Sequence, residues 1–475
     1  MKKLLIFILV FTVFAGCKKD VTTLNVDPKS PPSVPSYTLF TNAQRTLART
    51  IASPNVNLNI FRLIEQYWTE TTYTDESNYD LQTRQIPRGI WNALYRDVLR
   101  DFLEARTLIP NDVLDPTTQK NQLAVIDVME VYTWYYLVTT YGDIPYTEAL
   151  NIENAFPKYD SQASIFADLL KRLDADIAAF DITGESLGNA DIIYSGDVAS
   201  WKKFAASFKL KIGMTLSDVD AAASKTIVES AIAAGIFSSS ADDAVFKFLS
   251  GPPNTNPVWE DLVQSGRKDF VGTSTIIDTM MFLNDPRLPL YFTPDASGAK
   301  FSGGTVGASN NYTAFSKPST TLSAPDYPVS FLTFSEIEFY LAEAKERAYN
   351  VPGTAVEHYN AAITSSILSW EGSLEQATAY LAQPRVSYAS EVGNFKQKIG
   401  FQKWLALYNR AWDAWIEQRR LDAPTLPAPD APVTDFPVRF TYSIDEQNIN
   451  TTNYNAASKA IGSDEVTTKL YWDKF

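Results

Sequence analysis

Apolar side chains recur at helical spacing in several long blocks of this chain, and this periodicity constrains its fold more than any other feature. In the clearest block, residues 119–141, apolar positions such as Leu123, Ile126 and Met129 fall three to four residues apart, and Gly142 follows the block. That spacing places one apolar stripe on a helix, and glycine commonly ends a helix. The same pattern predicts further helices over residues 161–180, 201–216, 225–234, 335–348 and 404–420. The chain is therefore predicted to be mainly α-helical.

The block at 404–420 also carries aromatic residues on one predicted face, namely Trp404, Tyr408, Trp412 and Trp415. Rings at this spacing are expected to be buried against neighbouring helices. Successive amphipathic helices are typical of tetratricopeptide-like hairpins, although no strict repeat of about 34 residues is visible. The predicted fold class is mainly α, with tetratricopeptide-like helical hairpins.

Two long segments between the helical blocks lack any helical or strand period. Residues 250–330 are rich in Gly, Pro, Ser, Asn and Thr, and residues 421–437 contain five prolines. Irregular segments longer than about 15 residues are usually functional or disordered, and the aromatic residues within the first segment favour order. We therefore expect a large irregular, loop-rich face, with a loop-rich insertion at about 250–330, mounted on a helical frame.

The amino-terminal residues have the pattern of an export signal. A basic start at Lys2 and Lys3 precedes an apolar run over residues 4–13, and two small residues follow. About ten apolar residues are too few to cross roughly 30 Å of hydrocarbon, so the run is a signal core and not a membrane-spanning helix. Residues 1–16 are therefore predicted to be a cleavable signal peptide.

Cys17, the only cysteine of the chain, directly follows this signal. Residues 13–17 resemble the lipobox of bacterial lipoproteins, in which the cysteine becomes the first residue and carries acyl chains such as palmitate. Stable anchoring needs two or more chains, and such a lipoprotein typically carries three. The alternative is an incidental buried cysteine. Residues 17–36 are polar and proline-rich and are predicted to be a flexible tether, and residues 37–475 are predicted to form a single α-helical domain.

Net charge and histidine content exclude two classes of function. The chain carries −14 at neutral pH, and loss of Lys2 and Lys3 with the signal peptide changes this to −16. A protein this acidic repels phosphate backbones, so no nucleic-acid partner is expected. With His358 as the only histidine and Cys17 committed to lipid, the chain cannot assemble a zinc cage of His and Cys ligands.

Motifs for catalysis are missing from the sequence. No Walker loop, nucleophilic triad or EF-hand spacing occurs. Acidic pairs such as Asp75-Glu76 are frequent, but glycosidases need two carboxylates at a set distance in space, which adjacency does not define. A solvated acidic face is the simpler interpretation. We expect no catalytic residue, metal or cofactor; a structural Ca²⁺ ion is compatible with so acidic a chain but has no supporting motif.

Aromatic residues in polar surroundings are the candidates for ligand binding. One cluster lies among hydroxyl, amide and carboxylate side chains at residues 66–80, and a second lies in or beside the 250–330 segment. Exposed rings stack on flat apolar faces while Asn, Asp and Thr bond hydroxyls, which suits sugars or peptides. For each single ring, ordinary core packing is the alternative. The candidates are Trp68, Tyr73, Tyr79, Trp259, Phe270 and Tyr291.

Several motifs, in order along the chain, resemble one family. Residues 141–146 read Tyr-Gly-Asp-Ile-Pro-Tyr and are followed by Glu148-Ala149, and Gly196-Asp197 precedes a Trp-Lys-Lys-Phe-Ala block. A helix at 334–347 and the Gln-Lys-Trp to Arg-Arg helix at 402–420 complete the pattern, with the closing residues 453–457 and 472–473. Together they resemble the SusD/RagB-like outer-membrane lipoproteins, in the branch called SusD-like 2.

The resemblance implies a nutrient-binding lipoprotein that is not an enzyme. It would be anchored on the outer membrane, facing the cell exterior, and would bind an oligosaccharide or peptide. As the lid of a SusC-like TonB-dependent transporter, it would deliver that nutrient to the barrel. The residues after the anchor, 18–20, carry only one acidic side chain and match poorly the acidic export signal of surface lipoproteins. A surface polysaccharide hydrolase and a structural helical adaptor lipoprotein remain as alternatives.

Replacing Cys17 tests the predicted anchor. We expect Cys17→Ala to leave the fold intact and to move the protein from the detergent-extracted membrane fraction to the soluble fraction, because the body should not need lipid to pack. Cell fractionation and circular dichroism measure the two effects. A variant that stays in the membrane fraction without any partner would contradict the lipid anchor.

Overall fold

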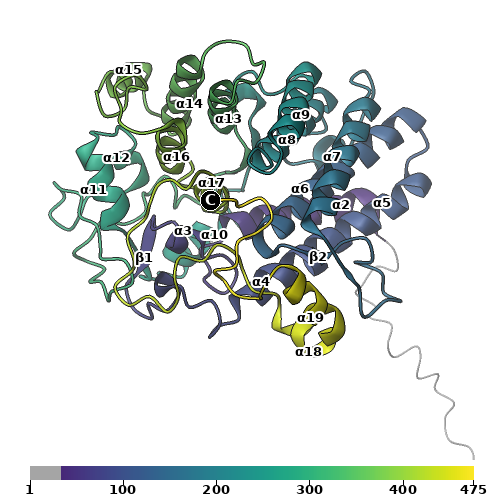
Figure 1. Ribbon diagram of the computed structural model, residues 1–475, viewed down its shortest axis with the longest axis horizontal. Helices are drawn as coiled ribbons and strands as arrows, with labels where there is room; N and C mark the ends of the chain where they lie inside the picture. Colours follow the sequence, from purple (N-terminus) through teal and green to yellow (C-terminus); the bar gives the residue numbers. More distant parts are fainter. Residues whose placement is uncertain (1–33) are drawn as a thin grey trace, which may run out of the picture. The chain divides into compact units, whose positions relative to one another are not determined.

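The computed structural model describes residues 34–475, so the predicted signal peptide, Cys17 and most of the tether lie outside the described residues. Helices dominate this range and strands are few and short (Figure 1), which confirms the mainly α prediction. None of the helices within residues 34–475 is both long and apolar enough to cross a bilayer.

The helices follow one another with short and long connections. In chain order they are α2 (Ser36–Ala52), α3 (Phe61–Ile64), α4 (Ile86–Asn92), the π-helix η3 (Ala93–Leu99), α5 (Arg100–Asp112), α6 (Pro116–Tyr141), α7 (Gln162–Ala179), α8 (Val198–Thr215), α9 (Ala221–Ala234), α10 (Pro257–Trp259), the π-helix η6 (Glu260–Gln264), α11 (Ser274–Phe282), α12 (Leu288–Tyr291), α13 (Phe334–Glu346), α14 (Ala355–Ser369), α15 (Leu374–Leu381), α16 (Phe395–Ala406), α17 (Ala411–Leu421), α18 (Ile444–Ile449) and α19 (Thr451–Ala460).

Local signals explain where the expected helices begin and end. Ser161 and Asp197 cap α7 and α8, because their side chains accept hydrogen bonds from backbone N–H groups of the first turn. Helix α6 ends at Gly142, whose φ of 96° favours glycine. The blocks predicted at 119–141, 161–180, 201–216, 225–234 and 335–348 are therefore helices in the structure, with boundaries shifted by a few residues.

The block predicted as one helix over 404–420 is two helices. Helix α16 ends at Ala406 and α17 begins at Ala411, so the chain turns between them. The turn lets the aromatic stripe divide: Trp404 packs near Tyr67, whereas Trp412 stacks on Phe61 with ring centroids 4.8 Å apart. All four rings of the stripe are buried, as predicted. A single straight helix does not reach both neighbours, and the single-helix prediction was wrong.

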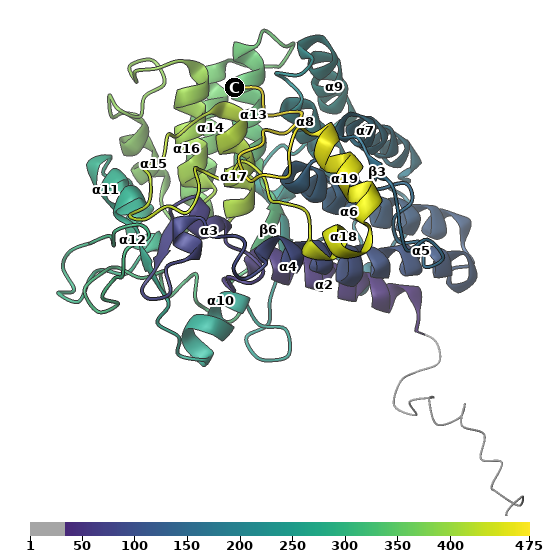
Figure 2. The ribbon, with the colours of Figure 1, turned by 60° about the horizontal axis from the view of Figure 1, so that its bottom comes forward.

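Neighbouring helices pack as pairs to form the frame. Helix α6 packs on α7, α8 on α9, and α13 on α14, and α13 also contacts α8 and α16. Figure 1 shows these pairs side by side across the upper part of the view. Figure 2 shows α10 and the loops around it at the bottom of the view, well away from α9 at the top. The frame is thus tetratricopeptide-like, with irregular segments gathered on another part of the surface.

Within residues 34–475, three two-stranded antiparallel sheets lie between the helices. The pairs are β1 (Trp68–Glu70) with β5 (Phe270–Gly272), β2 (Ile144–Pro145) with β3 (Tyr159–Asp160), and β4 (Ala244–Phe246) with β6 (Val329–Leu332).

The 250–330 segment holds more regular structure than its composition predicted. Four helical elements, α10, η6, α11 and α12, lie within it. Helix α11 is capped by Thr273 and buries Ile276, Ile277 and Met280, so a buried apolar face, and not a loop, occupies this part. The remainder of the segment, from 293 to 328, has only isolated bridges and turns.

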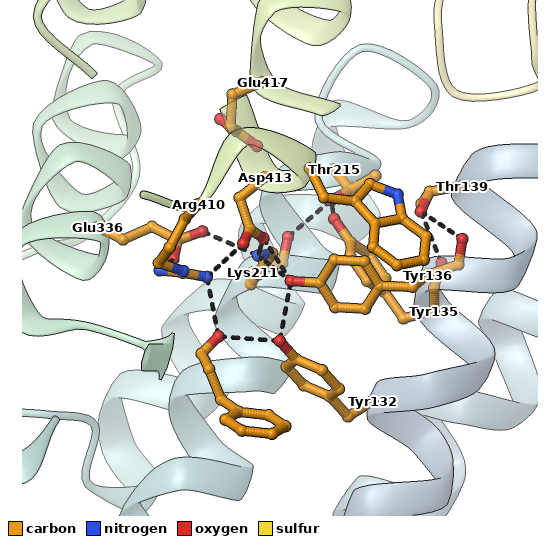
Figure 3. Close-up of polar contacts among 12 residues, drawn as sticks. Tyr132, Tyr135, Tyr136, Thr139, Lys211, Thr215, Glu336, Arg410, Asp413 and Glu417 are labelled. Carbon is orange, nitrogen blue, oxygen red and sulfur yellow. Dashed lines mark hydrogen bonds and ion pairs between the residues drawn. The ribbon is translucent and has the colours of Figure 1, made fainter. Parts of the chain in front are cut away.

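A buried cluster of charges joins the helix pairs (Figure 3). The Lys211 ammonium of α8 lies 2.9 Å from the Glu336 carboxylate of α13 and also contacts the Asp413 carboxylate of α17. The Arg410 guanidinium lies 2.7 Å from Asp413 and also pairs with Glu336. Tyr136 of α6 donates its hydroxyl to Asp413. Charges this deeply buried are tolerated because each has partners of opposite sign.

The two arginines of the Arg-Arg motif are also buried, and of the two only Arg420 forms ion pairs with the described residues. Arg420 lies between the Glu343 and Glu417 carboxylates, at 2.5 and 2.7 Å, and Lys403 reaches Glu417 at 2.8 Å. Arg419 donates to backbone carbonyls of distant segments. Both arginines lie near the end of α17, where their charges complement the helix dipole. The buried ion pairs of Arg420 are the larger structural role, and the sequence alone did not indicate them.

The charge cluster shifts the titration of Glu336. Burial opposes ionisation of this carboxyl, but Arg410, Lys211 and Lys403 outweigh it and lower the pKa from 4.5 to about 2. A carboxyl whose folded-state pKa lies below its unfolded value stabilises the fold above the unfolded pKa. This contribution is therefore present above pH 4.5 and is lost as the pH falls towards 2.

Replacement of Glu336 tests the cluster. Because Glu336→Gln leaves buried cations short of a partner, we expect the free energy of unfolding at pH 7 to fall by about 3–5 kcal/mol. The deficit relative to the wild type should shrink as the pH falls below 4.5. Urea unfolding at several pH values measures both effects. The control Glu375→Gln, on the exposed start of α15, should change stability by less than about 0.5 kcal/mol; equal losses in both variants would contradict the cluster's role.

Candidate ligand-binding cleft

Two short strands bring the two predicted ligand-binding segments together. In the β1–β5 ladder Trp68 lies opposite Gly272. Beyond the ladder, the Thr71 N–H donates to the Asp269 carbonyl at 2.8 Å, and the Asn310 N–H donates to the Thr71 carbonyl at 3.0 Å. The residues of the first cluster therefore lie beside those of the second, although only some of their rings reach the surface.

Trp68 is part of the core. Only 1% of its surface is exposed. Its ring lies under the Arg62 guanidinium, at 4.8 Å, and 5.7 Å from the Phe270 ring, and its Nε1–H donates to the Tyr408 hydroxyl at 2.8 Å. A ring packed in this way has no free face for a ligand, so the predicted stacking role does not fit Trp68.

Tyr291 and Tyr79 are buried as well. Tyr291 stacks on Tyr408 with ring centroids 4.2 Å apart, and its hydroxyl donates to the Leu405 carbonyl at 3.0 Å. Tyr79 is 3% exposed, and its hydroxyl accepts a hydrogen bond from the Gln66 side chain at 3.1 Å. A ligand-contact role does not fit either ring, because tertiary packing covers both.

Tyr73 is the exception in the first cluster. It is 79% exposed and has a φ of 56°, which is uncommon for a residue with a side chain. Beneath its loop lie Glu70 and Glu76, where burial and the neighbouring Glu76 raise the pKa of Glu70 to about 8. The loop thus rests on a buried acidic pair and presents one tyrosine ring to solvent.

Trp259 and Phe270 line one cleft of about 390 Å³. Trp259 is half-buried and Phe270 is almost fully buried, so the cleft exposes part of one ring and the edge of the other. The other side chains that line the cleft are Leu262, Val263, Thr293, Tyr312, Lys317, Pro318, Thr320, Ser323 and Pro325.

One wall of the cleft is built by α10 and the π-helix η6. Asn256 caps α10, and η6 follows directly and carries Leu262 and Val263 into the wall. The Arg49 guanidinium of α2 holds η6 through two hydrogen bonds to Glu260, at 2.9 and 2.7 Å. π-Helical turns are rare and frequently occur at functional sites, and this one is fixed to the helical frame.

The opposite wall comes from the irregular chain after Asn311. The Lys317 ammonium lies 5.2 Å from the centroid of the Tyr312 ring. Two hydrogen bonds between Lys317 and Thr293 fix this wall. The Thr293 N–H donates to the Lys317 carbonyl at 2.9 Å, and the Lys317 N–H donates to the side-chain Oγ1 of Thr293 at 3.3 Å. Sequence reasoning did not single out Tyr312 or Lys317; only their place in the aromatic, loop-rich segment indicated them.

The lining of the cleft suits binding. Ring faces from Trp259 and Tyr312 offer flat apolar surface, and Thr293, Thr320 and Ser323 offer hydroxyls. Among the described residues that line the cleft there is no Asp, Glu, His or Cys, so its side chains hold neither a carboxylate pair nor a nucleophile–base pair for acid–base chemistry.

Other hollows of the described residues fit a ligand less well. A wider groove of about 870 Å³ runs past Phe282, but the Arg385 guanidinium already covers that ring at 3.8 Å. A cavity of about 220 Å³ beside β6 is lined by the charged residues Asp243, Glu336 and Arg410, two of which belong to the buried charge cluster. The cleft beside Trp259 is the candidate ligand site because it holds two of the predicted aromatic residues, Trp259 and Phe270.

A helical frame that carries an aromatic, hydroxyl-lined cleft defines a binding protein. The sequence profile of the SusD-like 2 family, described as "Starch-binding associating with outer membrane", matches residues 28–443. The chain belongs to this family, as its motifs predicted. The family is associated with the outer membrane and its members are binding proteins.

Solved structures of the same fold support this placement. A chitin-binding protein is 25% identical, with a TM-score of 0.81, and the match covers 93% of this chain and 100% of the other. A SusD homologue from Bacteroides uniformis is 23% identical, with a TM-score of 0.78 and coverage of 92% and 100%. A chitin-binding SusD homologue from Flavobacterium johnsoniae is 21% identical, with a TM-score of 0.79 and coverage of 92% and 99%. A search of curated proteins finds no match to this sequence.

Proposed function

We propose that this protein binds an oligosaccharide in the cleft between η6 and the Tyr312–Lys317 wall. The observation that carries the proposal is the combination of partly exposed Trp259 and Tyr312 rings with free hydroxyls in one cleft. Pyranose rings present flat patches of C–H groups that stack on aromatic faces, and their hydroxyls bond side-chain hydroxyls. The exposed Tyr73 ring, two residues beyond the Thr71 bonds to Asp269 and Asn310, extends the surface available to a longer chain.

The relatives favour a glycan over a peptide. The family is described as starch-binding, and two of the solved structures are named as chitin-binding. Starch and chitin are both chains of pyranose rings, and the C–H faces of such rings can stack on aromatic side chains. A peptide ligand is the second candidate, and peptide binding without glycan binding would overturn the proposal.

The protein is further proposed to act as an anchored lid. Cys17 would carry the lipid that holds it on the outer membrane, with the body facing the cell exterior. A SusC-like TonB-dependent transporter would receive the bound saccharide, and coupling in the transporter would supply the free energy for uptake. A lid in this role needs affinity and no chemistry, which agrees with a cleft lined by rings and hydroxyls and makes a hydrolase the weaker alternative.

The two ring residues of the cleft provide the test of glycan binding. We expect Trp259→Ala and Tyr312→Ala each to weaken oligosaccharide binding roughly tenfold, the loss of about 1.4 kcal/mol that one stacked ring provides. Calorimetric titration of chitohexaose and maltohexaose measures the affinity. Trp259→Phe, which retains a ring, should lose less than Trp259→Ala.

A matched control separates the cleft from the rest of the surface. Tyr37, on α2, is 54% exposed and does not line the cleft, so Tyr37→Ala should bind like the wild type. Melting temperatures of all variants exclude unfolding as the cause. Unchanged affinity in both cleft variants, with glycan still bound, would place the site elsewhere.

Copurification tests the proposed partner. Extraction of native membranes in a mild detergent, followed by capture of the tagged protein, should recover a TonB-dependent barrel in about equimolar amount, because the lid and the barrel form one transport unit. Capture of the Cys17→Ala form, which lacks the predicted anchor, shows whether recovery of the barrel depends on the lipid. Recovery of the anchored protein alone, across several mild detergents, would favour a solitary binding protein or adaptor.

A further inference from the structure

Lys317 is a cation without an anionic partner inside the cleft. Within residues 34–475 no carboxylate lies within 4.0 Å of its ammonium, and its side chain makes no hydrogen bond; its contact is the Tyr312 ring. Partial removal from water lowers the pKa of Lys317, and the charge of Asp295 acts in the opposite direction. The Asp295 carboxylate, however, accepts its hydrogen bonds from Ser297 and Ser302, at 2.5 and 2.9 Å.

The other polar side chains of the cleft are neutral groups that can each donate a hydrogen bond. The Trp259 indole N–H, a donor only, has no acceptor among the described residues. Thr293 Oγ1 already accepts the Lys317 backbone N–H, so its own hydroxyl hydrogen is free to donate. The hydroxyls of Thr320 and Ser323 make no hydrogen bond to the residues that the structure describes.

None of these neutral groups balances the charge of Lys317. No Asp, Glu, Asn or Gln side chain lines the cleft in the described part of the chain, and the Pro325 carbonyl is already used by the Asn256 N–H at 2.7 Å. A neutral saccharide can bond the hydroxyls of the cleft, but it brings no anion to the ammonium. A carboxylate or sulfate accepts hydrogen bonds from the hydroxyls and the indole, and it also matches the charge of Lys317.

We infer that the saccharide recognised by the cleft is acidic, and that Lys317 pairs with its anionic group. The inference rests on the proposed glycan-binding function and adds the class of glycan. In a chain with net charge −14, an acidic ligand would be repelled at most surfaces, so a local cation surrounded by donors sets where and in which orientation it binds. Lys317 is on this basis a specificity-determining residue.

Matched oligosaccharides test the inference. Chitohexaose and maltohexaose are each titrated in three forms: neutral, carboxylated at C6, and sulfated at O6. We expect the acidic form of whichever backbone binds to have at least tenfold higher affinity than the neutral form at 50 mM NaCl. The preference should fall at 500 mM NaCl, because salt screens a partly exposed pair. The carboxylated and sulfated arms identify which anion the cleft prefers.

Variants at Lys317 identify the source of the preference. Lys317→Met should reduce the ratio of acidic-form to neutral-form affinity from at least tenfold to near one. Lys317→Arg should retain the advantage of the acidic forms. The control Lys300→Met removes an exposed lysine of the same segment that does not line the cleft, and it should have no effect beyond a small change in net charge.

The outcomes separate the inference from the function on which it rests. Equal binding of neutral and acidic forms, with loss of binding in Trp259→Ala, would overturn the acidic ligand and leave the glycan site in place. A preference for acidic forms that survives in Lys317→Met would also overturn the role of Lys317. If none of the six oligosaccharides binds, the proposed function fails and the inference fails with it.

Discussion

The fold depends on ion pairs that are formed away from water. Lys211, Glu336, Arg410 and Asp413 come from α8, α13, the turn before α17 and α17, respectively, and each is almost completely buried. Helix pairs that met through apolar faces alone could slide along one another. Two buried cations and two buried anions instead keep all their ion pairs only when the helices that carry them meet in one alignment. The cluster therefore fixes the register between the first helix pairs and the last, and everything mounted on them inherits that register.

The candidate cleft inherits its geometry from this frame through two connections. The Arg49–Glu260 pair attaches the π-helical wall to α2, and the β1–β5 ladder attaches the neighbouring chain to the core tryptophans and tyrosines. The ligand-facing side chains Tyr312 and Lys317 lie on irregular chain, but that chain is held at Thr293. Rings and donors are thus presented at fixed positions before any ligand arrives, which lowers the cost of ordering them on binding.

Sequence reasoning succeeded where signals are local and failed where contacts are distant. Periodicity and Gly142 predicted five helices, because those signals act within a few residues. The candidates at 66–80 were chosen for their polar neighbours, yet Glu70 and Ser77 are themselves buried and bond to each other. Trp68 is covered largely by residues distant in sequence, namely Phe270 and Tyr408, and no local pattern encodes those contacts. For the same reason Arg410 gave no indication that it would interrupt a helix to reach the core.

The two strands of the β1–β5 ladder are far apart in the sequence, and this separation bears on how the protein folds. The Thr273 hydroxyl donates to the Gln66 carbonyl, 207 positions earlier in the chain, and closing so large a loop is costly until the intervening helices have compacted. The contact between residues 66–80 and the segment after residue 250 therefore depends on the compaction of all the helices between them. A chain truncated before Thr273 lacks this contact, so nothing holds its β1 segment in a ladder.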